Sequence, residues 1–180
     1  MNNVDISKVL RHIRVTRNIF IGVFPAEKVP NKKDIISYPC CFIANTQPSW
    51  LPGEHWVAVY VGKNGISEFF DSYGRRPVNP KIKSFCGRKY VFNPVMLQSP
   101  FSAACGQFCI YFLVKRCQGI PMQMIISGFD YNNLRKNDEL VMTFIDKRFP
   151  YDKLSDKSNK YLIKQICSAL CKIRKSKTLL

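Results

Sequence analysis

The sequence contains very little histidine, and this scarcity limits the chemistry available to the chain. Only two of its 180 residues are histidine, His12 and His55, and they lie far apart. No Cys-x-x-Cys pair occurs among the eight cysteines. Because structural zinc sites combine closely spaced cysteines and histidines, we expect no bound metal.

Long apolar runs are also missing. No stretch of 18 or more apolar residues occurs, which excludes a membrane-spanning helix, and the first residues lack the features of a secretion signal. A chain of 180 residues is long enough for a single domain, residues 1–180. Its hydrophobic content of 46% is enough for a large core. We therefore expect a protein that is neither secreted nor bound to membranes, with mostly reduced cysteines.

Acidic residues are scarce relative to basic ones. The chain has 28 Lys+Arg and 12 Asp+Glu, which gives a net charge of +16. The basic residues are spread along the chain, with a dense group after Lys153. A surplus of this size attracts polyanions, and nucleic acid is the leading candidate partner. The alternative is a basic surface that is merely solvated.

Apolar periodicity and turn residues predict an α+β chain. A helix is expected over residues 5–17, capped by Asp5 or Ser7. Two β-rich runs, residues 56–61 and 66–71, flank Asn64-Gly65, a strong signal for a two-residue hairpin. The remaining expected elements are one or two strands among the loops of residues 18–52, a strand over 90–97, a nearly all-apolar helix over 105–117, a helix over 139–148, and a basic amphipathic helix over about 158–175 within the C-terminal segment 150–180.

The most informative segment surrounds Cys105. Small residues precede this cysteine, Gly106 follows it, and a strongly apolar helical pattern comes next. A thiol at the start of a buried helix meets the positive end of the helix dipole and free backbone N–H groups, which favour the thiolate. We therefore interpret Cys105 as a nucleophile.

A nucleophilic sulfur needs a base, and the histidine content leaves little choice. His55 begins the first strand of the expected hairpin and Asp71 ends the second, so the turn should return Asp71 to the side of His55. Glu68 lies inside the return strand, and Glu54 points away from His55 if this segment is extended. Asp71 is therefore the favoured partner, while His12 is expected to be an exposed helix residue.

An oxyanion that forms beside the sulfur needs hydrogen-bond donors. The backbone N–H of Cys105 is one candidate. Gln98, expected at the end of a strand, offers a side-chain amide, and the turn after it bends the chain so that both donors converge. The order His55, Asp71, Gln98, Cys105 therefore predicts acyl transfer by a cysteine nucleophile.

These motifs resemble those of the adenovirus-type (adenain-like) cysteine endopeptidases. The matching stretches are Gly-Glu-His55-Trp56, Phe-Asp71-Ser-Tyr-Gly and Gln98-Ser-Pro-x-Ser-Ala-Ala-Cys105-Gly. Further matches in residues 20–24 and 41–46 extend the resemblance over about residues 4–117. Related proteases occur in Polinton or Maverick virus-like DNA transposons and in their viral relatives.

The resemblance implies a papain-like or Ulp1-like α+β fold, in which a central helix carrying the cysteine packs on a mixed sheet carrying the histidine and the acid. By position, His55 resembles the base, Asp71 its partner (the best-known members have Glu there), Gln98 the oxyanion donor and Cys105 the nucleophile. We interpret Trp56 as a side chain that shields the histidine and borders the substrate groove.

Members of this family mature virion proteins and work on DNA inside the particle, and a disulfide joins some of them to a short peptide. The resemblance therefore implies capsid or core precursors as protein substrates, and DNA and a short activating peptide as cofactors. It also implies a location in the virion and in the host nucleus or cytoplasm. Cys86 lies close to the position of the peptide-linking cysteine.

Two other functions stay open. A SUMO- or ubiquitin-like isopeptidase of the same clan shares the His-Asp-Gln-Cys order, but that group usually has Asp where this chain has the two alanines before Cys105. The other alternative is a basic DNA-binding or scaffold protein that keeps a protease fold without catalysis. The complete set of four residues argues against it.

Overall fold

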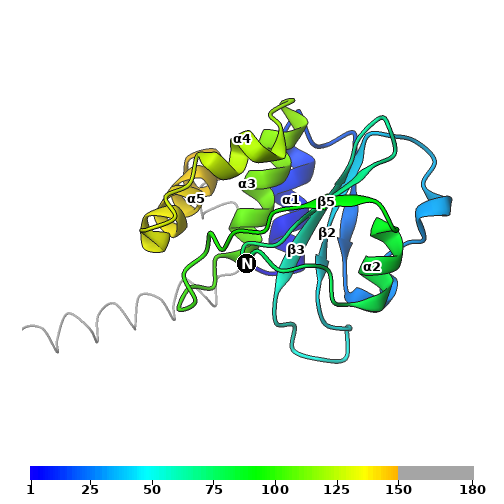
Figure 1. Ribbon diagram of the computed structural model, residues 1–180, viewed down its shortest axis with the longest axis horizontal. Helices are drawn as coiled ribbons and strands as arrows, with labels where there is room; N and C mark the ends of the chain where they lie inside the picture. The colour runs from blue at the N-terminus through cyan, green and yellow to red at the C-terminus, as the bar shows by residue number, and fades with distance from the viewer. Residues whose placement is uncertain (150–180) are drawn as a thin grey trace, which may run out of the picture. The chain divides into compact units, whose positions relative to one another are not determined.

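The computed structural model describes residues 1–149, and the helix predicted in the segment 150–180 lies outside the described residues. Five strands form one mixed sheet in sequence order: β1 (Phe20–Phe24), β2 (Cys40–Asn45), β3 (Trp56–Val61), β4 (Ser67–Phe70) and β5 (Tyr90–Phe92). The three central strands are antiparallel, whereas β1 and β5 run parallel to their neighbours (Figure 1).

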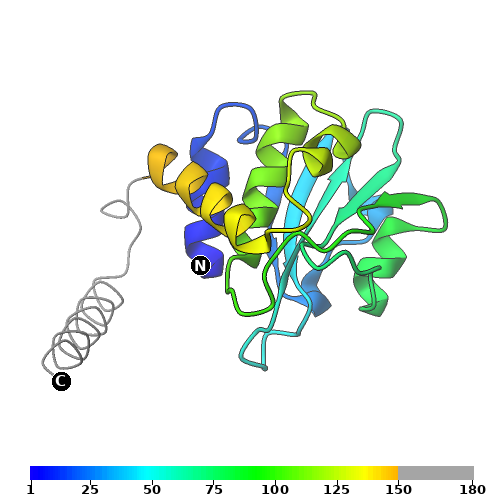
Figure 2. The same ribbon diagram turned by 60° about the vertical axis from the view of Figure 1, so that its left-hand side comes forward.

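Helices cover both faces of this sheet (Figures 1 and 2). One face carries α1 (Asn3–His12) and α3 (Cys105–Cys117), and α4 (Met122–Ser127) and α5 (Leu134–Arg148) pack against α3. The opposite face carries α2 (Pro80–Cys86), together with two short 3₁₀ turns (Ala26–Lys28 and Lys32–Asp34) between β1 and β2. The predicted α+β class, with the cysteine-bearing helix packed on a mixed sheet, is confirmed.

One layer of core attaches α2 to the sheet and a second layer, on the opposite face, attaches α3. Strands β2 and β3 are buried almost throughout, as expected for a sheet covered on both faces. On the α2 side, Phe42 and Phe85 meet edge to face with ring centroids 4.8 Å apart. On the α3 side, Phe70 stacks on Phe112 at 4.6 Å. Each fully buried phenylalanine contributes about 1.5–3 kcal/mol to folding, so the helix that carries Cys105 is firmly attached.

The structure corrects the predicted first helix. It begins at Asn3 and ends at His12, instead of covering residues 5–17. The cap is Asn2, not Asp5 or Ser7, because the Asn2 side chain accepts a hydrogen bond from the N–H of Asp5. The backbone is extended at Ile13, and the Thr16 hydroxyl donates to the carbonyls of Leu10 and Ile13, so the helix ends before its apolar pattern does.

Other boundaries also differ from the prediction. Helices α2 and α4 are not predicted, because seven and six residues are too few to show a helical period. Helix α5 starts at Leu134 because the Asn133 side chain caps it. Strand β5 ends at Phe92, so the strand expected over residues 90–97 is wrong beyond that point.

The hairpin of β3 and β4 is confirmed, but the predicted two-residue loop is wrong. The loop runs from Gly62 to Ile66, where the N–H of Gly62 donates to the Ile66 carbonyl over 3.2 Å. Gly65 supplies the positive φ of +73° that the turn needs. The strand register pairs Ala58 with Phe70, so the residues just before β3 and just after β4 lie at the same end of the sheet.

Residues 1–149 contain neither a helix that could cross a membrane nor a cluster of metal-ligating side chains. None of the helices in this part of the chain combines the length and the apolar character needed to cross a membrane. The same residues contain no group of three or more His, Cys, Asp and Glu side chains arranged to hold a metal ion.

Candidate active site

Cys105 is the first residue of α3 and is only 9% exposed. Its sulfur accepts hydrogen bonds from two backbone N–H groups, that of Gly106 in the helix and that of Trp56 in β3. A Cβ on Gly106 would lie 3.5 Å from Cδ1 of Trp56, an ordinary van der Waals distance, so the first turn of the helix packs against the strand. The placement of a thiol at a helix N-terminus, predicted from sequence, is confirmed.

His55 and Asp71 meet at the end of the sheet beside this sulfur. His55 directly precedes β3 and Asp71 directly follows β4. The imidazole Nε2 lies 2.7 Å from Asp71 Oδ1, and the same ring forms a hydrogen bond with Cys105. Since Asp71 occupies Nε2, Nδ1 is the ring atom that remains for the sulfur. The structure therefore brings the three predicted residues into one hydrogen-bonded chain.

The electrostatics of this hydrogen-bonded chain shift the pKa values of His55 and Cys105 toward a charged pair. Burial disfavours the charge on His55, but the hydrogen bonds and charges of Asp71 and Cys105 outweigh it and raise the His55 pKa to about 9. Burial also opposes the Cys105 thiolate, yet the hydrogen bond to His55 and the two backbone N–H groups lower the pKa of Cys105 below its ordinary value. Both shifts favour the form in which the sulfur is a thiolate and the imidazole is protonated.

The competing carboxylates have other partners. Glu68 forms a two-pronged ion pair with Arg116 of α3, at 2.7 and 2.9 Å. Glu54 accepts a hydrogen bond from the Gln47 side chain at 3.0 Å. Asp71 is therefore the carboxylate that orients His55, as the hairpin argument favoured.

Asp71 is itself positioned by a residue that the sequence did not single out. The buried Asn93 side chain accepts the Asp71 N–H at 2.9 Å and donates to the Asp71 carbonyl at 2.7 Å. This pair of bonds extends the sheet beyond β4 and β5 through a side chain. The N–H of Tyr73 donates to Asp71 Oδ1 at 2.8 Å, so Asn93 fixes the backbone of Asp71 and Tyr73 helps to fix its carboxylate. No periodic pattern marks Asn93, because its role depends on a contact 22 residues away along the chain.

The turn after Asp71 requires glycine at position 74. Gly74 has φ of +71°, and a Cβ there would lie 2.6 Å from the carbonyl carbon of Val95. We expect Gly74→Ala to lower the free energy of unfolding by about 2 kcal/mol more than the same change at Gly65. Gly65 is a matched control, because it has φ of +73° and a Cβ added there would have no atom within 4 Å. Urea unfolding measures both variants; equal losses would contradict the close approach.

Gln98 lies in a loop, since β5 ends at Phe92, and its predicted place at a strand end is wrong. The buried side chain is nevertheless fixed at both ends. Its Oε1 accepts a hydrogen bond from the Ser72 hydroxyl at 2.7 Å, and its Nε2 donates to the Ser102 carbonyl at 2.7 Å. An amide nitrogen carries two hydrogens, so one donor remains after the bond to Ser102.

Helix α5 holds the loop between Gln98 and Cys105. The Asn137 side chain donates to the Leu97 carbonyl at 3.0 Å, and Asp138 accepts from the N–H of Ser99 at 3.3 Å. Burial raises the pKa of Asp138, against hydrogen bonds that lower it. These contacts link residues about 40 positions apart, and sequence reasoning missed them.

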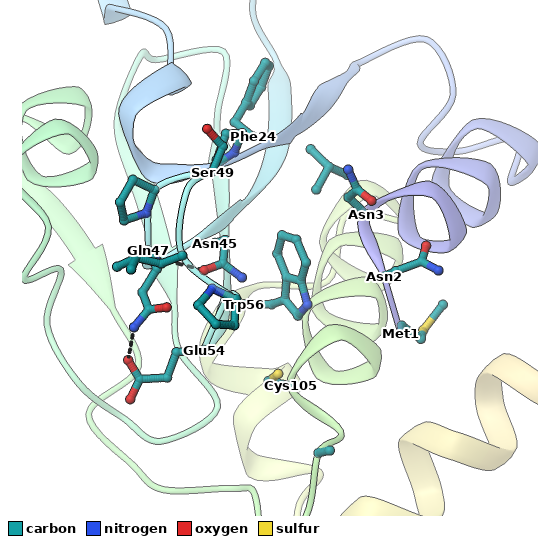
Figure 3. A pocket seen from close by; sticks show the side chains of 17 residues that line it. Met1, Asn2, Asn3, Phe24, Asn45, Gln47, Ser49, Glu54, Trp56 and Cys105 are labelled. Carbon is teal, nitrogen blue, oxygen red and sulfur yellow. Dashed lines mark hydrogen bonds between the residues drawn. The ribbon is translucent and has the colours of Figure 1, made fainter. Parts of the chain in front are cut away.

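Trp56 lines a pocket of about 500 Å³ together with Cys105. Figure 3 shows its indole in the middle of this pocket, between Asn45 on the sheet side and Asn3 on the α1 side, with the sulfur close by. The predicted shielding of His55 by Trp56 is wrong: the ring against His55 is Tyr73, with centroids 4.9 Å apart. Trp56 therefore borders the groove without covering the histidine.

Cys86, predicted near the position of a peptide-linking cysteine, is a core residue. It is 0% exposed and packs with Phe42 and Phe85 between α2 and the sheet. Burial raises its pKa to about 12. A thiol in this environment is unreactive toward a peptide disulfide, so the structure gives no support to this linkage.

Comparison with protein families finds no family model that matches this chain. Among solved structures, the ASFV pS273R protease is similar at a TM-score of 0.49 and 17% identity, over 78% of this chain and 66% of that protease. The chain thus spans less than two thirds of the length of that protein. The central domain of the uncharacterized Lpg1148 protein from Legionella pneumophila is similar at a TM-score of 0.46 and 17% identity, over 81% of this chain and 98% of that domain.

Proposed function

We propose that this protein is a cysteine endopeptidase with Cys105 as nucleophile, His55 as acid and base, and Asp71 as orienting group. The single observation that carries this proposal is the continuous hydrogen-bonded chain from Asp71 through His55 to Cys105. A buried thiolate–imidazolium pair has no structural advantage over apolar packing, whereas it is the ground state that thiol proteases need.

The mechanism follows from this geometry. The Cys105 thiolate attacks the carbonyl carbon of the peptide bond, and negative charge develops on the carbonyl oxygen. The backbone N–H of Cys105, free at a helix start, and the remaining amide hydrogen of Gln98 are the proposed donors to this oxygen. His55 then gives its proton to the leaving nitrogen, and a thioester forms. His55 next removes a proton from water, which attacks the thioester and releases the acid and the free thiolate.

Replacement of Gln98 tests the oxyanion role. We expect Gln98→Ala to lower kcat by on the order of 10²–10³, the usual loss for one oxyanion donor. Steady-state assays with a peptide that the wild-type enzyme cleaves give kcat and KM separately, and KM should change little. Ser102→Ala is a matched control, because the backbone carbonyl that receives the Gln98 bond stays in place. A wild-type rate in Gln98→Ala would remove this residue from the site.

We further propose viral or virus-like structural precursors, such as capsid or core proteins, as the substrates. The support is the resemblance of the motifs around the four site residues to adenain-like proteases. A peptide library, cleaved with and without DNA, tests this function, with Cys105→Ala as the inactive control. Cleavage within peptides that contain Gly-x-Gly would support it. Release of a SUMO fusion with no cleavage of such peptides would favour the isopeptidase alternative.

Nucleic acid is the proposed second partner. The support is the net charge of +16, which favours association with polyanions. In this proposal DNA guides or activates the protease, as the resemblance implies. The remaining alternative, a basic protein on a protease fold without catalysis, would show no rapid alkylation of Cys105 near neutral pH.

A further inference from the structure

Two pockets border Cys105 and His55, and the residues that line each pocket indicate which half of a bound peptide it would hold. The pocket of about 500 Å³ contains Cys105 and Trp56. A second pocket of about 460 Å³ contains His55, Asp71 and Tyr73. The carbonyl carbon must reach the sulfur, while the leaving nitrogen must reach the protonated histidine. We therefore call the first the acyl-side pocket and the second the leaving-side pocket.

Two arginines, Arg75 and Arg76, line the leaving-side pocket. Aromatic faces hold both in place: Arg75 lies 5.3 Å from the Tyr73 ring centroid, and Arg76 lies 4.3 Å from that of Phe92. Stacking on a ring leaves the N–H edge of a guanidinium free to bind a carboxylate in two-pronged fashion. Both side chains are exposed and thus accessible to a ligand.

The charge of this pocket is positive. Among the ion pairs of residues 1–149, none involves Arg75 or Arg76. Asp71 is paired with His55, and Glu54 is the other acidic residue that lines the pocket. Two arginines against one glutamate outside any ion pair leave a net attraction for anionic groups.

The contacts of the Tyr73 ring also limit how far from His55 the anion can lie. The His55 and Tyr73 ring centroids are 4.9 Å apart, and the guanidinium carbon of Arg75 lies 5.3 Å from the Tyr73 centroid. Arg75 therefore lies no more than about 10 Å from the His55 ring, a span that an extended chain covers in about three residues at about 3.4 Å each. A carboxylate two or three residues after the scissile bond would therefore come within reach of Arg75, and Arg76 lines the same pocket.

We propose that Arg75 and Arg76 select substrates with acidic residues at the second and third positions after the scissile bond. The proposal rests on the proposed function, since it needs peptide cleavage by Cys105. It adds a charge preference on the leaving side, which neither the net charge nor the four site residues specify.

Paired peptides test the selectivity directly. One library peptide that the wild type cleaves is made with Asp or with Lys at the second and third positions after the cleaved bond. We expect kcat/KM to favour the Asp peptide about tenfold at low salt, because each exposed ion pair contributes a few-fold. High salt should reduce the preference. The double variant Arg75→Ala/Arg76→Ala should cleave both peptides equally, and Arg75→Glu/Arg76→Glu should prefer Lys.

Arg88→Ala is the matched control, because Arg88 is also exposed and basic but does not line the pocket, and it should retain the Asp preference. Should the Glu variant fail to fold, Arg75→Gln/Arg76→Gln replaces it, with loss of preference as the expected result. Equal wild-type cleavage of both peptides, or a preference that survives in the Ala variant, overturns this proposal alone. A wild type that cleaves no library peptide overturns the proposed function as well.

Discussion

Replacement of Cys105 by alanine is expected to lower kcat for peptide cleavage by on the order of 10⁶, the loss seen when a nucleophile is removed from a catalytic triad. The reason is that the sulfur forms the covalent intermediate, and no other group in the hydrogen-bonded chain replaces it. The fold should persist, since the change removes a single side-chain atom, the sulfur, from a residue that lines a pocket. Single-turnover assays and circular dichroism measure the two effects.

A second cysteine of the same helix provides the control for this result. Cys117 ends α3 and is partly exposed, whereas Cys105 begins it. Cys117→Ala should keep the wild-type rate. If Cys105→Ala retained measurable turnover, or if Cys117→Ala lost it, the assignment of the nucleophile would be wrong.

Loss of His55 is expected to have an effect almost as large. His55→Ala should lower kcat by on the order of 10⁵ or more, because it removes both the partner of the thiolate and the acid for the leaving group. Without the imidazolium, burial dominates at Cys105, and its pKa should rise from its lowered value. Alkylation of Cys105 by iodoacetamide at neutral pH should then slow markedly, because a smaller fraction of the sulfur is thiolate. His12→Ala replaces the only other histidine and should change neither kcat nor the rate of Cys105 alkylation.

The raised pKa of His55 also predicts the alkaline limb of the pH profile. The thiolate must be present and His55 must be protonated for the leaving nitrogen to receive a proton. Activity should therefore persist below the ordinary pKa of a thiol, because the pKa of Cys105 is lowered, and fall as pH rises through about 9, where His55 loses its proton. A profile of kcat/KM that keeps rising above pH 9 would contradict the ion-pair assignment.

The parts of the site that could be predicted are those that depend on local patterns. The apolar run after Cys105 marks a helix, and small residues before it mark its start, so the sulfur lies where the pattern indicates. The hairpin signal near Asn64 brings Asp71 back to His55, even though the loop is longer than predicted. An antiparallel register tolerates such an error, because the ends of paired strands still meet.

The parts that could not be predicted depend on contacts between distant segments. The orientation of the Gln98 amide follows from Ser72 and Ser102, and the position of Asp71 follows from Asn93. The loop before Cys105 is held by a helix about 40 residues further along the chain. Such contacts leave no period in the sequence, because a single polar side chain makes each of them.

Local sequence was enough to specify the α+β class, the helix that begins at Cys105 and the hairpin that pairs His55 with Asp71, because periodicity and turn residues act over short stretches of chain. The surroundings of these residues came from tertiary packing alone. It buries Cys86 in the core, sets Tyr73 instead of Trp56 against the His55 ring, and places two arginines beside the leaving-side pocket. Burial and neighbours across the sheet are properties of packing, and packing joins residues that the order of the chain keeps apart.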